Sequence, residues 1–201
     1  YVRAVQPDDI VDPQRYLPRV ETLRAAGGAS AAAIEAFEDR PLPSTYQALR
    51  GQIQRSEAPE DWPPVRAWAL SSLCARLHAE PDLAHGLIEV LLAENDIETA
   101  WSLATKYDVG EHDLLRLVSL REVTHPADVI EPYQWLIEMR INMPSDKDRY
   151  ENAIKLIQRL GDAYARVGDR SGFMFYLDDL CKRYRRKRLF ISRLQSEIAI
   201  R

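Results

Sequence analysis

Cysteine and histidine residues of the metal-binding type recur in one short stretch of the sequence. Cys74 and His78 are four residues apart, so on a helix both would lie on one face, and His85 follows seven residues later. A structural zinc site needs four such ligands, and no spacing here specifies a fourth. A small buried thiol beside a surface histidine explains the pair better. We therefore expect no metal and no other cofactor in this chain.

The other histidines and the acidic pairs give no catalytic pattern. His112 stands at an expected helix start and His125 precedes a proline, which are positions typical of helix caps and first turns. Adjacent acids such as Asp178 and Asp179 point in different directions on a helix, whereas acid–base catalysis needs carboxylates that converge in a dry cleft. No glycine-rich phosphate loop, GxSxG or HExxH motif is present. The sequence predicts a protein that is not an enzyme.

A basic segment, residues 182–188, is the feature that composition alone does not explain. It holds six cations in seven positions: Lys182, Arg183, Arg185, Arg186, Lys187 and Arg188. Residues 170–201 carry nine basic and three acidic side chains, net +6, while the whole chain has a formal charge of −4, which leaves −10 for residues 1–169. The segment could bind nucleic-acid phosphates or an acidic protein surface. Its simplest explanation is a solvated helix end whose cations face the negative end of the helix dipole.

Three tryptophans, Trp68, Trp101 and Trp135, fall at helical positions among aliphatic residues. Tryptophan in a stack of helices usually belongs to the core. The alternative is an exposed aromatic groove that binds a partner peptide, because tryptophan is favoured at binding hot spots.

Composition sets the broad class of the protein. The chain has 201 residues, 46% of them hydrophobic and 29% charged, which is enough to bury a core without disulfides or metal. The two cysteines, Cys74 and Cys181, form no CxxC motif, so we expect a reducing, cytoplasmic setting. The apolar runs are shorter than the roughly 18 to 20 residues of a membrane span. Because residue 1 is Tyr1, we expect a fragment of a longer product.

The elements that would position these residues are helices throughout. Eight of the 12 prolines lie in the first 64 residues, which predicts short helices there, among them 30–38 and 44–54. From residue 61 the helical period continues with few breaks. It predicts helices over 61–77, from about 81 to 95, over 97–107, around 114–118, from about 126 to 141, over 145–168 and over 173–198.

Particular residues mark the ends of these helices. We expect Asp61 and Ser145 to cap the helices that follow them and Gly168 to end the longest one. Pro132 should kink its helix or delay its start. The stretch 173–198 fits either one long helix or two helices with a break near Lys187, where a cation occupies an expected apolar position.

No stretch shows the alternation of a strand, so the sequence predicts an all-α protein. Successive helices with short connections favour an irregular α-solenoid, a helical-repeat stack of antiparallel helix pairs similar to tetratricopeptide repeats but without a strict 34-residue period. We expect a proline-rich N-terminal segment, residues 1–60, packed on a helical-repeat domain, residues 61–201.

Three stretches together resemble a known family: Trp62 to Arg66 with Ala69, Leu70 and Leu73; Tyr150 to Gly168; and Phe173 to Leu194 with the run Arg185 to Phe190. They resemble the long helical C-terminal region of bacterial SWIM-type zinc-finger proteins, in which a comparable helix precedes paired helices and a terminal basic helix. The resemblance covers about residues 44–198. The SWIM metal motif itself, CxC followed by CxH, is absent, so no zinc ligand of the family can be assigned to this chain.

The resemblance implies a helical region attached to a zinc-finger module in a larger bacterial protein. Stacked helix pairs expose extended faces that suit partner proteins better than substrates. We therefore expect a non-catalytic scaffold that mediates protein–protein interaction, with a protein partner and no membrane contact. The alternative is a nucleic-acid-binding module that acts through the basic segment.

Overall fold

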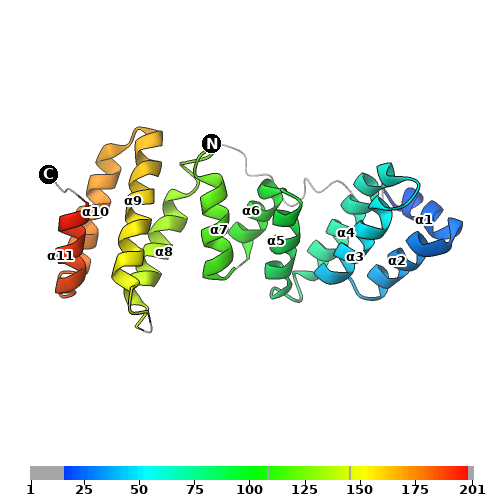
Figure 1. Cartoon of the computed structure of the whole chain (residues 1–201), viewed down its shortest axis with the longest axis horizontal. Coiled ribbons are helices and arrows are strands. Elements are labelled where there is room, and N and C mark those ends of the chain that lie inside the picture. The colour runs from blue at the N-terminus through cyan, green and yellow to red at the C-terminus, as the bar shows by residue number, and fades with distance from the viewer. Residues whose placement is uncertain (1–15, 108, 145, 199–201) are drawn as a thin grey trace. The chain divides into compact units, whose positions relative to one another are not determined.

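The computed structural model describes residues 16–107, 109–144 and 146–198, and these residues are predominantly α-helical (Figure 1). They form eleven α-helices and one short 3-10 turn, and none of them lies in a β-strand. The expected all-α class is therefore confirmed. None of the described helices is both long enough and apolar enough to cross a membrane.

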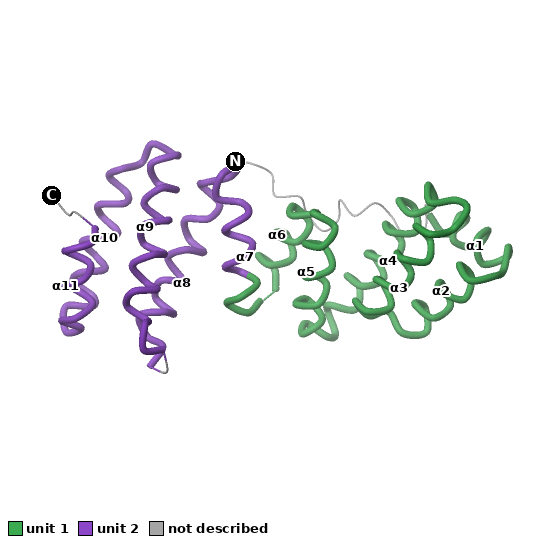
Figure 2. The backbone as a smooth tube through the Cα atoms, in the orientation of Figure 1, with its two compact units in different colours: residues 1–113 green, residues 114–201 purple. Residues whose placement is uncertain are grey.

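The chain divides into two compact units, residues 1–113 and residues 114–201 (Figure 2). Unit 1 contains α1 (Leu17–Ala26), α2 (Gly28–Asp39), α3 (Pro43–Gln54), the 3-10 turn (Pro59–Asp61), α4 (Trp62–Arg76), α5 (Leu83–Ala93) and α6 (Ile97–Lys106). Helix α7 (Glu111–Arg121) begins in unit 1 and continues into unit 2. Unit 2 also contains α8 (Ile130–Asn142), α9 (Arg149–Val167), α10 (Arg170–Arg183) and α11 (Arg188–Glu197).

Buried aromatic pairs connect the helices of unit 1. Helix α2 packs on α1 and α3, and α3 packs on α4. Phe37 meets Trp68 edge-on with 5.3 Å between ring centroids, and Tyr46 meets Trp62 in the same way at 5.4 Å. Edge-to-face pairs stabilise the fold beyond the area that they bury. Trp101 is also buried, so Trp68 and Trp101 belong to the core as expected. Helices α1 and α3, which precede residue 60, both pack on α4, which follows it.

Unit 2 is built around α9, whose apolar stripe repeats every three or four residues. Ile154, Ile157 and Leu160 are fully buried on this stripe. Helices α8, α10 and α11 all pack on α9. Phe190 of α11 is also fully buried and contacts the ring of Tyr150 at a centroid distance of 5.6 Å. Long-range apolar packing, more than helix propensity, therefore stabilises this unit.

Two of the sharp turns between helices share one arrangement. Asn95 after α5 and Gly168 after α9 both adopt left-handed backbone conformations, with φ of 59° and 76°. The next residues, Asp96 and Asp169, each accept a hydrogen bond from the backbone N–H three residues later, at 3.1 and 2.8 Å. The left-handed residue reverses the chain, and the aspartate caps the following helix.

The expected cap at Asp61 is wrong. Its side chain makes no capping hydrogen bond to α4. The carboxylate instead accepts from Nε and Nη2 of Arg19, at 2.5 and 2.7 Å, and is only 6% exposed. A two-point bond to a guanidinium satisfies a buried carboxylate better than one backbone N–H, which explains the difference.

The other expected boundaries have mixed outcomes. Pro132 lies in the first turn of α8, where a missing N–H costs nothing, so the helix start is delayed to Ile130. Residues 173–198 form two helices rather than one, with the break at 184–187. Gly168 ends α9 as predicted. The expected cap at Ser145 lies outside the described residues.

Candidate functional site

The basic segment spans the end of α10, the connection 184–187 and the first residue of α11. Three of its six cations are held by partners within unit 2. Lys182 contacts Asp178, and Arg183 contacts both Glu138 and Asp179. Lys187 donates from Nζ to the backbone oxygen of Ile141 at 3.1 Å and to the side chain of Asn142 at 3.0 Å. Lys187 therefore ties this connection to the end of α8.

The other three cations of the segment, Arg185, Arg186 and Arg188, are exposed to solvent. Within the part of the chain that the structure describes, they form no ion pair and no hydrogen bond through their side chains. The structure thus divides the predicted group of six in half. Within the basic segment, these three arginines are the ones whose guanidinium groups have no partner among the described residues and can meet an external anion.

Exposed apolar side chains lie in the same part of unit 2. Phe175 on α10 is 77% exposed and Leu189 on α11 is 62% exposed. The same two helices also line an open groove of about 450 Å³, whose lining residues are Met174, Leu177, Asp178, Cys181 and Gln195. Trp135 on α8 is 44% exposed and so departs from the core role of the other tryptophans.

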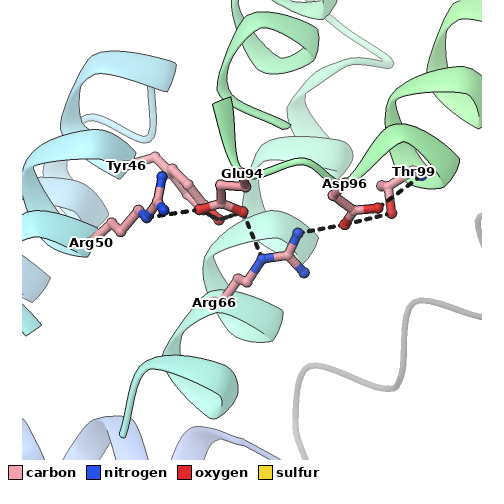
Figure 3. A network of polar contacts seen from close by, with 6 residues as sticks. All are labelled: Tyr46, Arg50, Arg66, Glu94, Asp96 and Thr99. Carbon is pink, nitrogen blue, oxygen red and sulfur yellow. Dashed lines mark hydrogen bonds and ion pairs between the residues drawn. The ribbon is translucent and has the colours of Figure 1, made fainter. Parts of the chain in front are cut away.

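A buried carboxylate organises unit 1 (Figure 3). Glu94, directly after α5, is 6% exposed and accepts hydrogen bonds from the hydroxyl of Tyr46 at 3.0 Å and from Nε of Arg66 at 2.7 Å. Arg50 forms an ion pair with it at 3.4 Å. Arg66 also contacts Asp96 at 2.5 Å. The network joins α3, α4 and both sides of the α5–α6 turn.

Burial and pairing shift the pKa values of this network in directions that strengthen it. Burial and the nearby Glu94 charge raise the pKa of Tyr46 far above its usual value, so its hydroxyl stays a donor. Burial would raise the pKa of Asp96, but hydrogen bonds from Arg66 and Thr99 lower it. Since every charge here already has a partner inside the unit, the network stabilises the fold of unit 1.

Unit 2 contains a similar carboxylate. Glu122, directly after α7, accepts from the hydroxyl of Tyr133 at 2.5 Å and from Nε and Nη2 of Arg159 at 3.2 and 3.0 Å. Burial would raise the pKa of Glu122, but the bonds from Arg159 and Tyr133 lower it. From the sequence, Glu94 and Asp96 are an acidic pair expected at helix caps or on a solvated face, and Glu122 does not stand out; the burial of Glu94 corrects that expectation for Glu94. The only local signal is an acidic residue directly after a helix, which is too common to single out.

The residues Cys74, His78 and His85 are not brought together as a metal-binding group. His78 is exposed, and burial raises the pKa of the Cys74 thiol, which disfavours the thiolate that would bind a metal. His85 instead contacts Asp113. Among the described residues, a different group of potential metal ligands lies close together: Glu89, His112 and Asp113, with one potential ligand atom of each within 4.8 Å of the others.

Comparisons of the chain with models of protein families, with characterised proteins and with solved structures find no match. The resemblance to the helical region of SWIM-type proteins therefore stays a prediction.

Proposed function

We propose that the chain is an α-helical interaction module that binds another protein through the C-terminal part of unit 2. The binding surface comprises the exposed residues Phe175, Arg185, Arg186, Arg188 and Leu189. The observation that carries the proposal is that residues 175–189 contain two strongly exposed apolar side chains, together with exposed arginines that have no partner among the described residues. Such a combination is typical of a docking surface for a partner that is both apolar and acidic.

The exposure of the apolar residues is the stronger part of this argument. A solvated helix end would explain arginines, but it does not explain Phe175 at 77% and Leu189 at 62% exposure. Large apolar side chains gain free energy when a partner removes them from water, and arginine and aromatic residues are enriched at hot spots. We propose on this basis a protein partner with acidic residues around an apolar anchor.

The sequence resemblance supports a proposal for the wider context of the module. We propose that the helices form an irregular solenoid of helix pairs in a cytoplasmic scaffold, part of a larger bacterial protein of the SWIM zinc-finger type. Several pairs of consecutive helices pack on each other, namely α1 on α2, α2 on α3, α3 on α4, α5 on α6, α8 on α9 and α9 on α10, and this kind of packing supports a stack of helix pairs. The absence of a catalytic motif favours a binding role over an enzymatic one.

Nucleic-acid binding through the basic segment is the second candidate, and the three unpaired arginines favour it. Since Lys182, Arg183 and Lys187 already have partners, we assign at most three phosphate contacts to the segment. Three contacts give a log–log salt slope of about −2.7 on duplex DNA. This is a small electrostatic term, and the −10 charge of residues 1–169 opposes it. Protein binding therefore ranks first.

Capture from extracts of cells that contain the protein tests this proposal. Three forms of the chain are immobilised: the wild type, the double variant Phe175→Ser with Leu189→Ser, and a triple variant in which Arg185, Arg186 and Arg188 are changed to Glu. Nuclease is added to half of each extract. A partner should bind the wild type with or without nuclease and be lost from both variants. The matched control is Val123→Ser, since Val123 is an apolar residue of unit 2 that is 68% exposed.

Two outcomes contradict the protein-binding proposal. Retention that disappears on nuclease treatment would favour nucleic acid. Equal capture by the wild type and the Phe175 and Leu189 double variant would show that these side chains do not bind the partner.

A further inference from the structure

We propose that unit 1 contains a binding site for a divalent transition-metal ion such as Zn²⁺, with Glu89, His112 and Asp113 as its ligands. Glu89 lies on α5, and the other two residues lie in the first turn of α7. One potential ligand atom from each residue lies within 4.8 Å of the other two. This inference is independent of the proposed binding surface on unit 2.

Asp113 is the strongest sign of a missing cation. Its side chain is only 1% exposed, and one carboxylate oxygen, Oδ2, contacts Nδ1 of His85. The other oxygen, Oδ1, is buried and accepts no hydrogen bond from any described residue. A buried carboxylate oxygen without a donor is costly and rare in folded proteins. A cation bound at Oδ1 would satisfy it.

His85 completes the arrangement as a positioning residue. It lies on α5 one helical turn before Glu89, and its ring nitrogen holds the second oxygen of Asp113. Carboxylate ligands are commonly fixed by such hydrogen bonds, which keep the free oxygen directed at the metal. Helix α5 therefore supplies one ligand and also orients another.

The donor set selects the class of metal. One imidazole with two carboxylates suits zinc and neighbouring transition metals, whereas Mg²⁺ and Ca²⁺ prefer oxygen ligands alone. Three protein ligands leave a fourth position for water or a partner's ligand. Ligand atoms of a tetrahedral zinc site lie about 3.4 Å apart, and the exposed side chain of His112 has the freedom to approach the two carboxylates.

The sequence gives no hint of this site because its residues belong to two separated segments. His112 lies in the first turn of a helix, as its sequence position predicts. In the sequence, Glu89 is a charged residue that interrupts the apolar run 86–93. Only the folding of α5 and α7 places them together. The site shares no ligand with the Cys74 and His78 pair.

Zinc binding to the whole chain tests this proposal. The chain is stripped of metal with a chelator, and Zn²⁺ is titrated in by calorimetry and by competition with a chromogenic chelator. We expect one equivalent to bind, without competition from a tenfold excess of Mg²⁺. His112→Ala should abolish binding, and because His112 is exposed this variant should keep its fold. His85→Ala should weaken binding about tenfold or more.

Matched controls are His125→Ala and Cys74→Ser, which should bind zinc as the wild type does. Cobalt in place of zinc gives a second readout, because its visible absorption reports ligands directly. A wild-type dissociation constant weaker than about 100 µM would overturn the proposal. Equal zinc affinity in His112→Ala, or loss of binding in Cys74→Ser, would overturn it as well.

Discussion

Replacing Glu94 by Gln tests the claim that a buried carboxylate holds unit 1 together. The substitution keeps the size of the side chain but removes the charge that Tyr46, Arg50 and Arg66 all share. Gln also introduces an amide N–H group where only acceptors are needed. The change therefore breaks charge-assisted hydrogen bonds at a position that is 6% exposed.

The size of the effect follows from these contacts. Hydrogen bonds to charged groups contribute about 1.5–3 kcal/mol each, and breaking a buried ion pair costs about 3–5 kcal/mol. Arg66 and Arg50 keep 27% and 31% exposure, so water recovers part of the loss. We expect Glu94→Gln to lower the free energy of unfolding of unit 1 by about 2–3 kcal/mol. At a urea m-value of about 1.5 kcal/mol/M, the midpoint falls by about 1–2 M.

Urea titration followed by tryptophan fluorescence measures this change. Three of the four tryptophans, Trp62, Trp68 and Trp101, are buried in unit 1, so the signal reports mainly on that unit. The matched control is Glu80→Gln, which breaks the exposed ion pair of Glu80 with Arg76 and should cost less than about 0.5 kcal/mol. A midpoint for Glu94→Gln within error of the Glu80→Gln midpoint would refute the reasoning.

Three further predictions concern unit 2. Hydrogen bonds lower the pKa of Glu122, so its contribution to the free energy of unfolding is complete above the unfolded pKa of about 4.5 and is lost progressively as the pH falls below that value. Denaturation at several pH values should therefore show a smaller acid-induced loss of stability in Glu122→Gln than in the wild type. Gly168 has φ of 76°, so Gly168→Ala should destabilise unit 2 by about 1 kcal/mol in thermal or chemical unfolding, whereas Gly168→Asn, which tolerates this conformation, should cost less. A labelled oligonucleotide should bind the wild-type chain more weakly than about 0.1 mM at about 150 mM salt, and micromolar affinity that disappears when Arg185, Arg186 and Arg188 become Glu would place nucleic acid first.

Local patterns predicted much of the helical structure. The stripe of α9 and the signal at Gly168 are both local in sequence, so the extent of that helix could be derived without the fold. The break between α10 and α11 was one of two expectations, because Lys187 occupies an apolar position of the helical repeat. Its Nζ reaches the end of α8, which accounts for a cation at that place.

The polar contacts could not be predicted, because their partners are distant in sequence. Tyr46 and Glu94 are 48 residues apart, and Arg66 is 28 residues from Glu94. For the same reason, the sequence could not show which cations of the basic segment have partners. In the sequence the six cations look alike, whereas Arg183 contacts Glu138, 45 residues away, and Arg185 forms no ion pair or side-chain hydrogen bond with the described residues. Which cations are free therefore depends on tertiary structure.

Photo-crosslinking at position 175 tests the proposed protein-binding surface most directly. A photoreactive amino acid replaces Phe175, or Val123 as the control, in the full chain expressed in cells of its source. Both positions are strongly exposed and both lie in unit 2, so they differ mainly in their place on the surface. Irradiation should give a discrete nuclease-resistant protein adduct at position 175 and none at position 123. The same adducts at both positions, or none at position 175, would contradict the proposed docking surface.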